Sequence, residues 1–365
     1  MNKEANIKCD GCGAALTFKS GTGSLSCQYC GHSQAINIET DSSVIEEFDI
    51  NEYVRETFDK EAVTEVATVK CNACSAETTL GDRLASKVCP FCSAPLVIQQ
   101  AQVKRMHTPQ YMLPFAVTEK EAFSNFQSWI KRLWFAPNAL KQYAVRNDKL
   151  QGVYLPFWTY DCSTTSRYVG KRGENYTVSG PNNSRTTRVR WSHASGTVYS
   201  YFDDVLVPAT SSLPNNRLEA LEPWDLENLK PYDGQFLTGF KTENYQITLR
   251  QGFSDAKNKM LRLIRQRIKA DIGGDRQNIS HIHTEYDNTT FKHILLPCWV
   301  SAYRFNGKTY QFLVNARTAE VQGDRPFSWV KITLAILTVL TLVGVLYSLD
   351  WKVIGEQLSL SINSL

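Results

Sequence analysis

Hydrophobic positions divide the chain into three parts. The first hundred residues hold few apolar side chains, which stand in short runs between pairs of Cys. Residues 105–326 are rich in aromatic and β-branched side chains, with strand-like runs and two stretches of helical spacing at 119–135 and 254–272. An uncharged apolar run follows from Ile332 to Leu349. This order predicts an α+β fold with small N-terminal modules, a β-rich α+β domain at 105–326 and a C-terminal apolar helix.

The β-rich domain has an internal repeat. Each helical stretch is followed by a strand-like run that contains Leu-Pro-x-Trp, as Leu155-Pro156-Phe157-Trp158 and Leu296-Pro297-Cys298-Trp299. We expect two copies of one α+β unit, at 105–210 and 211–326. Because proline cannot donate a ladder hydrogen bond, both strands are expected to lie at a sheet edge or to carry a bulge.

Two sets of cysteines carry the strongest chemical signal. Each set has two CxxC pairs separated by 14 residues, and the second set begins 62 residues after the first. A CxxC turn brings two thiolates together, and two such turns complete a tetrahedral four-sulfur site. The sets predict two structural zinc ions in two zinc ribbons, at 1–38 and 67–100. The ligands are Cys9, Cys12, Cys27 and Cys30 in the first ribbon, and Cys71, Cys74, Cys89 and Cys92 in the second.

Three other interpretations of these cysteines are weaker. A disulfide framework suits small secreted chains, and nothing marks this chain for secretion. A redox CxxC requires a βαβ context, which neither set has. Iron–sulfur ligation by four Cys fits the spacing, but paired turns at this interval favour zinc. Cys162 and Cys298 stand in apolar strand-like runs and are expected to be buried free thiols, which indicates a reducing compartment.

The connector between the ribbons, 39–66, is acidic. It carries ten acidic and two basic side chains, a net charge of −8. Apolar residues from Ile45 to Val63 allow an amphipathic helix, and the charges predict a solvated face or a docking surface for a basic partner. Residues 1–100 hold eight basic and fourteen acidic side chains, a net charge of −6, which would repel phosphate and makes nucleic acid an unfavourable partner.

Basic side chains concentrate in the stretch 250–269. Six of them lie close together, namely Lys257, Lys259, Arg262, Arg265, Arg267 and Lys269. Apolar residues such as Met260 and Ile264 make the stretch amphipathic. The favoured interpretation is a helix packed on the core with a solvated basic face. Contact with anionic lipid headgroups comes next, and duplex nucleic acid third.

Residues 329–349 predict a transmembrane helix, because the run is long enough to cross the hydrocarbon core and aromatic residues flank it. Arg325 and Lys331 precede the run and only Lys352 follows it. The positive-inside rule then places the N-terminal domains in the cytoplasm and a short tail, 350–365, outside. With no apolar signal segment before Cys9, the expected location is the cell inner (cytoplasmic) membrane, crossed once.

Catalytic motifs are missing from the sequence. No GxxxxGK[ST] phosphate loop, GxSxG nucleophile elbow or HExxH metal motif occurs. His281 and His283 would share one face of a strand, but exposed histidines are the plain interpretation. We therefore expect no enzyme activity.

Further segments complete a resemblance to a known family. They are Gly152-Val153-Tyr154-Leu155-Pro156-Phe157-Trp158, Leu221-Glu222-Pro223-Trp224-Asp225-Leu226, Leu296-Pro297-Cys298-Trp299 and Val314-Asn315-Ala316-Arg317-Thr318-Ala319-Glu320-Val321. Together with the double ribbon they resemble bacterial membrane-anchored double zinc-ribbon proteins, commonly labelled "transcription factor IIB-type zinc ribbon" or "primosomal protein N′-like". The resemblance covers nearly the whole chain.

The resemblance implies zinc at the eight Cys, a single C-terminal span, and a setting among proteins that recruit stomatin-like and phage-shock-type factors to a stressed membrane. Family members often read Asn-Gly-Gln-Thr-Gly where this chain reads Asn315-Ala316-Arg317-Thr318-Ala319, so two glycines of that turn are replaced. The expected function is a non-catalytic, membrane-anchored adaptor that docks partner proteins at the cytoplasmic face of the membrane. The alternative is a zinc-ribbon nucleic-acid-binding protein connected to replication or transcription.

Overall fold

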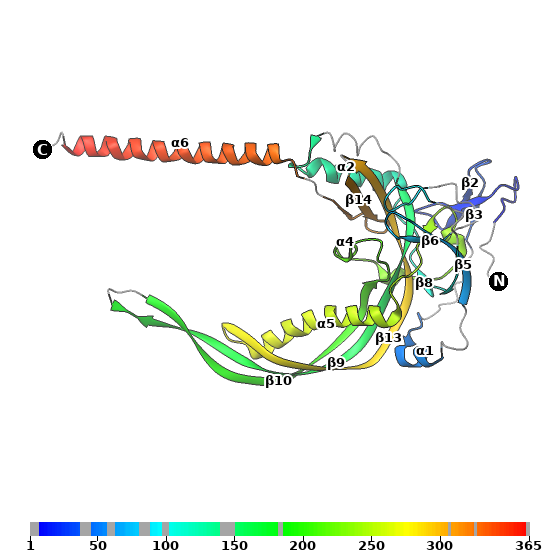
Figure 1. Cartoon of the computed structure of the whole chain (residues 1–365), viewed down its shortest axis with the longest axis horizontal. Coiled ribbons are helices and arrows are strands. Elements are labelled where there is room, and N and C mark those ends of the chain that lie inside the picture. The colour runs from blue at the N-terminus through cyan, green and yellow to red at the C-terminus, as the bar shows by residue number, and fades with distance from the viewer. Residues whose placement is uncertain are drawn as a thin grey trace.

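The computed structural model describes residues 7–36, 45–56, 63–79, 88–96, 102–138, 150–181, 185–305, 308–324 and 327–362. Its outline is an open C (Figure 1). A long curved arm forms one limb of the C, the C-terminal helix forms the other, and the body that joins them carries both Cys sets.

One large sheet organises the body and the arm. Its main strands follow the order β10-β9-β13-β14-β15. They are β9 (Gln151–Ser179), β10 (Arg185–Pro208), β13 (Arg276–Phe305), β14 (Lys308–Asn315) and β15 (Val321–Gly323). β9 pairs antiparallel with both β10 and β13 along most of its 29 residues. The ends of these three strands extend beyond the body as the arm (residues 163–179, 185–202 and 276–287).

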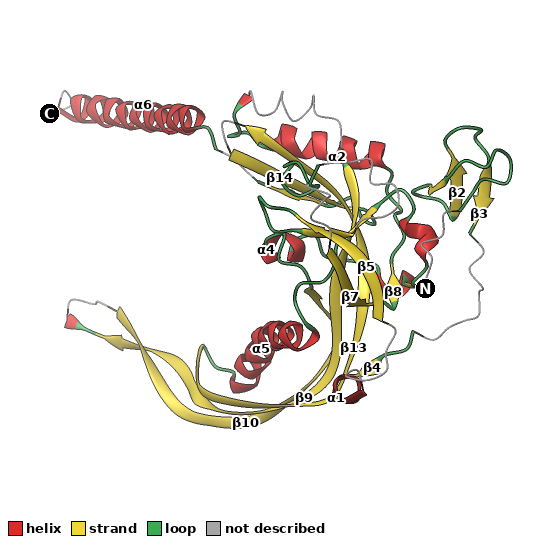
Figure 2. Ribbon diagram, turned by 45° about the vertical axis from the view of Figure 1, so that its right-hand side comes forward, coloured by secondary structure: helices red, strands yellow, loops and turns green. Residues whose placement is uncertain are grey.

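Two bulges mark the base of the arm. The register of β10 against β9 shifts between Phe202 and Val205, and that of β13 against β9 shifts between Asp287 and Thr290. The two shifts face neighbouring residues of β9, with the β10 shift opposite Asp161 and the β13 shift opposite Cys162. Because a bulge bends its strand and increases the local twist, bulges at one level on both neighbours account for the curve of the three strands there (Figure 2).

Two helices cover the same face of the sheet. α2 (Glu119–Arg132) buries Ala122, Phe126 and Ile130, and α5 (Leu249–Ile272) buries a row at the same helical spacing. Each begins with a capping box, built on Thr118 in α2 and on Thr248 in α5. α5 lies along the inner side of the arm (Figure 2). The helical spacing in the sequence therefore predicted both helices.

Short strands pair with the large sheet, and a segment with short helices covers its second face. β4 (Phe48–Asp49), β8 (Tyr111–Met112), β11 (Lys230–Pro231) and β12 (Lys241–Thr242) add edge pairings to the sheet. The short helices are α4 (Asn215–Glu219), η3 (Leu226–Asn228) and η4 (Gly234–Leu237). The segment from Leu206 to Leu229 packs over Leu155, Phe157 and Leu296 on the face opposite α2 and α5.

Each Cys set belongs to a small three-stranded sheet. The first contains β1 (Leu16–Phe18), β2 (Ser24–Cys27) and β3 (Ser33–Ala35). The second contains β5 (Val63–Lys70), β6 (Glu77–Thr79) and β7 (Gln102–His107), in the order β6-β5-β7. The connector between the sheets contributes only β4 and the seven-residue helix α1 (Ile50–Glu56) to the described part of the chain. The expected amphipathic helix is thus much shorter than the apolar spacing allowed, because Val63 already belongs to β5.

The C-terminal helix corrects one expectation. α6 runs from Trp329 to Ile362, beyond the predicted end of the span and into a segment with Asp350, Lys352 and Glu356. Within the described part of the chain, no helix has the length and apolar character that a membrane crossing requires.

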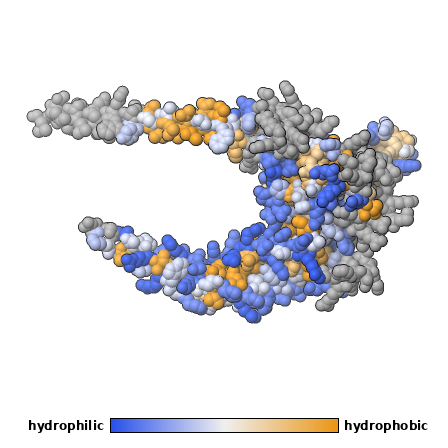
Figure 3. Space-filling model, in the orientation of Figure 1, coloured by the Kyte–Doolittle hydropathy of each residue, from blue (hydrophilic) through white to orange (hydrophobic). Residues whose placement is uncertain are grey.

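This finding contradicts the predicted transmembrane helix at 329–349 and the inner-membrane location that was inferred from it. The external tail at 350–365 and the contact with the bilayer were expectations that depended on that helix. What remains of the fold prediction is an α+β chain with two four-cysteine modules and a β-rich domain. The described surface of α6 is apolar, and Figure 3 shows this surface opposite the mainly hydrophilic arm.

Candidate metal centres

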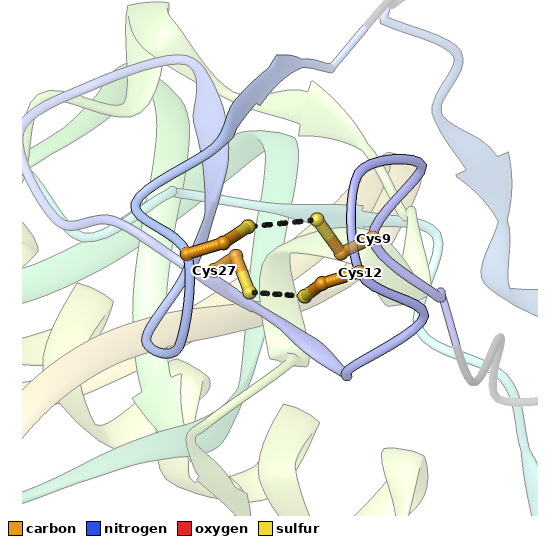
Figure 4. Close-up of side chains that lie close together, drawn as sticks. Cys9, Cys12 and Cys27 are labelled. Carbon is orange, nitrogen blue, oxygen red and sulfur yellow. Dashed lines mark hydrogen bonds between the residues drawn. The ribbon is translucent and has the colours of Figure 1, made fainter.

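The first Cys set forms one compact cluster. Cys9 and Cys12 stand in the turn before β1, while Cys27 ends β2 and Cys30 follows it. The Sγ atoms of Cys9 and Cys30 are 3.5 Å apart, as are those of Cys12 and Cys27. All four sulfurs lie within 4.8 Å of one another. Figure 4 shows the labelled Cys9, Cys12 and Cys27 pointing toward a common centre from the two turns.

The second set repeats this geometry. The Sγ atoms of Cys71 and Cys92 are 3.6 Å apart, and those of Cys74 and Cys89 are also 3.6 Å apart. A tetrahedral ion with metal–sulfur bonds of about 2.3 Å places its sulfurs about 3.8 Å apart. A disulfide would bring two sulfurs to about 2.05 Å, and all ten Cys of the chain are free thiols. Both sets could therefore hold a metal ion, and the disulfide interpretation is wrong.

The backbone of each CxxC turn is tightly defined. In every turn the N–H of the residue after the second Cys donates to the carbonyl of the first, at 2.8–3.0 Å. That residue has a positive φ, as in Gly13 (72°) and Gly31 (73°), and also in Ser75 (61°) and Ser93 (57°). The left-handed conformation favours glycine. The serines show that closing the four-cysteine cluster outweighs the local preference.

Backbone amides stabilise thiolates in these turns. The N–H groups of Cys30 and Tyr29 hold the pKa of the Cys27 thiol low, at about 6. In the second set the neighbouring Cys74 thiol holds the pKa of Cys89 at about 5, although burial opposes the shift. The pKa values of their neighbours move the other way and are raised, for Cys12 and Cys30 in the first cluster and for Cys74 and Cys92 in the second, so one thiol of each cluster ionises most readily.

The two centres differ in burial. In the first, Cys12 and Cys30 are exposed. Tyr29, which lies between Cys27 and Cys30 in the sequence, is 86% exposed. In the second, Cys71, Cys89 and Cys92 are buried together with Phe91 in the core that also contains Leu155 and Leu296. The first centre therefore lies at the surface of the molecule, and the second is part of its interior.

Side-chain hydrogen bonds attach the second ribbon to the large sheet. Gln311 Nε2 donates to the Phe91 carbonyl at 2.6 Å, and Ser93 Oγ donates to the Ala302 carbonyl at 2.5 Å. Thr79 Oγ1 donates to the Thr242 carbonyl at 2.9 Å. The first ribbon is attached by Phe18, whose N–H donates to Thr238 and whose ring meets Phe236 edge-on.

A third group of possible ligand atoms was not predicted from the sequence. Carboxylate oxygens of Glu47, Asp161 and Asp203 lie within 4.8 Å of one another at the base of the arm. The buried ammonium of Lys292 lies 2.9 Å from Glu47, 3.3 Å from Asp161 and 2.8 Å from Asp204. The group is an ion-pair network centred on Lys292. Its residues are far apart in sequence, so no local motif could reveal it.

The remaining candidate residues are structural. Cys162 and Cys298 are fully buried in separate clusters, as expected of unused thiols. His281 and His283 are exposed on the outer face of β13, where His283 lies 3.6 Å from Glu285. They form no metal group in the described part of the chain. On α5, Lys259 pairs with Glu219 and Glu222, which fits a core helix with a basic solvent face.

Comparisons with known proteins give one distant relative. The chain is 27% identical over 337 residues to "Uncharacterized protein YdjG" of Bacillus subtilis (strain 168), an alignment that covers 90% of this chain and 92% of the relative. No family model matches the chain. A search of solved structures also found no match. The likeness therefore extends over most of the chain, but the relative's name gives no activity.

Proposed function

We propose that the chain is a non-catalytic zinc-ribbon adaptor that binds a partner protein through the tip of its first ribbon. The difference in burial between the two centres carries this proposal. A ribbon that served stability alone would gain from being enclosed like the second one. The first instead presents Tyr29, at 86% exposure, between two of its Cys residues. Exposed aromatic side chains on rigid turns are typical anchors of protein interfaces.

Zinc is the proposed ion at both centres. Four thiolates in tetrahedral arrangement suit zinc or a single iron. The paired sulfurs lie 3.5–3.6 Å apart in both clusters, close to the spacing around a single tetrahedral ion, which supports a mononuclear ion over a cluster. Zinc would supply no redox chemistry, and its role would be to fold each ribbon. Elemental analysis of the purified chain should give two zinc ions, and stoichiometric iron would contradict this assignment.

A partner assay tests the adaptor function. Tyr29→Ser should abolish co-purification of the partner while both zinc ions stay bound, because the side chain points away from the ribbon's core. Tyr176→Ser on the arm is the matched control, since Tyr176 is 40% exposed and distant in the fold. The resemblance to double zinc-ribbon proteins makes stomatin-like and phage-shock-type proteins the first partners to test. Unchanged recovery with Tyr29→Ser would contradict the proposal.

Nucleic-acid binding is the second candidate. Exposed basic residues on the solvent side of α5, such as Arg262, Arg265 and Lys269, favour it. The net charge of −6 over residues 1–100 opposes it for the ribbons. Binding to duplex or single strands that weakens steeply with salt, and that Arg262→Ala with Lys269→Ala removes, would favour this candidate over the adaptor.

A further inference from the structure

The second metal centre places a large charge in an apolar environment. Four thiolates with one divalent ion carry a net charge of −2, and three of the four Cys are buried among apolar side chains. Taking such a charge out of water costs several kcal/mol unless a counter-charge or hydrogen bonds compensate it. At the first centre, exposed Cys12 and Cys30 leave the charge in contact with solvent.

Lys241 lies where a counter-charge is needed. It belongs to β12, which pairs in parallel with β9 so that Lys241 is opposite Val153, a residue of the same core as the second centre. Its Nζ donates to the carbonyl of Val88, the residue before Cys89, at 2.9 Å. It also donates to Gln151 Oε1 at 3.0 Å. The ammonium is thus fixed beside the turn that carries Cys89 and Cys92.

The electrostatics agree with this placement. Burial lowers the pKa of Lys241 to about 8, and the Cys89 thiolate opposes that shift by favouring the ammonium. Glu243, two residues further along, is buried, and desolvation raises the pKa of its carboxyl to about 8. A neutral Glu243 adds no negative charge near the thiolates.

We propose that Lys241 is a positioning residue for the second metal centre, where its ammonium compensates thiolate charge and holds the Cys89 turn through Val88. This inference rests on the proposed tetrathiolate zinc centres. The compensating charge then comes from the large sheet and not from the ribbon. Lys241, on β12, lies 153 residues after Val88 in the sequence. No feature of the ribbon sequence indicates this residue.

The test follows zinc release from the full chain. A chromogenic chelator should withdraw zinc in two phases, and a Cys12→Ser background identifies the phase that belongs to the second centre. Lys241→Met keeps the length of the side chain but removes the charge and the donors. It should speed the second phase by about tenfold, in line with other supporting residues of metal sites. The first phase is the internal control and should be unchanged.

Two further variants separate charge from packing. Lys241→Arg retains the charge and should restore slow release, whereas Lys241→Gln retains a donor without charge and should restore it only in part. Release of the second zinc at the parental rate in Lys241→Met, or equal acceleration in the Met and Arg variants, would overturn the proposal. Acceleration of both phases alike would also overturn it, because that would indicate general destabilisation.

Cobalt substitution provides a readout that packing alone would not change. Removing a nearby positive charge raises the energy of the thiolate electrons, so the sulfur-to-cobalt charge-transfer band of the second centre should move to longer wavelength in Lys241→Met. An unshifted band would contradict the charge role, even if the variant lost zinc faster. The co-purification assay with Tyr29→Ser is a separate experiment. If it shows no adaptor function, the zinc-release and cobalt results for Lys241 can still be interpreted.

Discussion

Trp158 and Trp299 make equivalent hydrogen bonds to opposite halves of the β-rich domain. Trp158 Nε1 lies 2.9 Å from the carbonyl of Ile247, the residue before the N-cap of α5. Trp299 Nε1 lies 2.9 Å from the carbonyl of Val117, the residue before the N-cap of α2. Their strands pair antiparallel, with Leu155 opposite Leu296. Trp158 thus fixes the start of α5, and Trp299 fixes the start of α2.

This relationship predicts similar losses at both positions. Trp158→Phe and Trp299→Phe should each lower the free energy of unfolding by about 1–3 kcal/mol, because each leaves a carbonyl without its donor. Urea unfolding measures the effect. Trp191→Phe is the control, since Trp191 is 44% exposed on the arm and should change little. A loss at only one of the two buried positions would contradict the equivalence.

The sequence predicted local features of the fold well. The two helices and the four-cysteine clusters depend on neighbouring residues, and all are present. It placed the two proline-containing strands at edges or bulges, yet Pro156 and Pro297 lie in β9 and β13, which are both interior strands of the sheet. Long-range pairing decided their place, and that information is not local.

Other features depend on contacts between distant segments. The segments at 221–226 and 314–321, noted in the sequence for a family resemblance, meet in the structure. Asn315 Nδ2 donates to the Leu221 carbonyl at 2.9 Å, and the Arg317 guanidinium pairs with Asp225. Burial opposes ionisation of Asp225, but hydrogen bonds from Arg317 hold its pKa below the usual value. No spacing rule could have paired them.

Ala319 offers a test of local strain. It occupies a turn with φ of 63°, where a side chain is disfavoured. Ala319→Gly should therefore raise the free energy of unfolding by about 1 kcal/mol. Ala270→Gly in α5 is the matched control and should lower it by about 1 kcal/mol, since glycine weakens a helix. The same sign for both variants in urea unfolding would refute this explanation.

Lys292 should be among the residues most sensitive to substitution. It is buried and pairs with Glu47, Asp161 and Asp204 at the base of the arm. Lys292→Met leaves these carboxylates without their cation and should cost about 3–5 kcal/mol of unfolding free energy. Adding Asp161→Asn should recover part of the loss, because the buried charge is then gone. Strictly additive losses in chemical denaturation would show that the groups act independently.

His293 should make the stability depend on pH. Burial, together with the neighbouring His107, lowers its pKa from 6.5 to about 3, and neither ring nitrogen has a hydrogen-bond partner among the described residues. Between about pH 3 and pH 6.5, His293 takes up a proton in the unfolded chain but not in the folded chain. Stability is therefore complete above pH 6.5 and falls below it, by about 1.4 kcal/mol at about pH 5.5.

His293→Phe should remove this component of the pH dependence. The side chain packs against Trp158 and Tyr245, so a phenyl ring can fill the space without losing a hydrogen bond. Urea unfolding of both proteins at about pH 7.5 and about pH 5.5 gives the comparison, in which any effect of acid on the two cysteine clusters is common to both. Equal losses in parent and variant would assign the pH dependence to other groups.

Metal removal should affect the two centres differently. Cys12→Ser disrupts a centre with two exposed ligands and should unfold the first ribbon while leaving the large sheet intact, because β1, β2 and β3 form a sheet of their own that packs on the domain through Leu16, Phe18 and Leu25. Cys89→Ser disrupts a centre inside the main core, where Phe91 and Val153 lie in the same cluster. The loss of metal binding there is a loss of folding free energy for the domain as a whole.

Amide hydrogen exchange should show faster exchange confined to residues 7–36 in the first variant, and faster exchange also in β9, β13 and β14 in the second. Exchange confined to the ribbon in both variants would mean that the second centre, despite its burial, folds independently of the sheet.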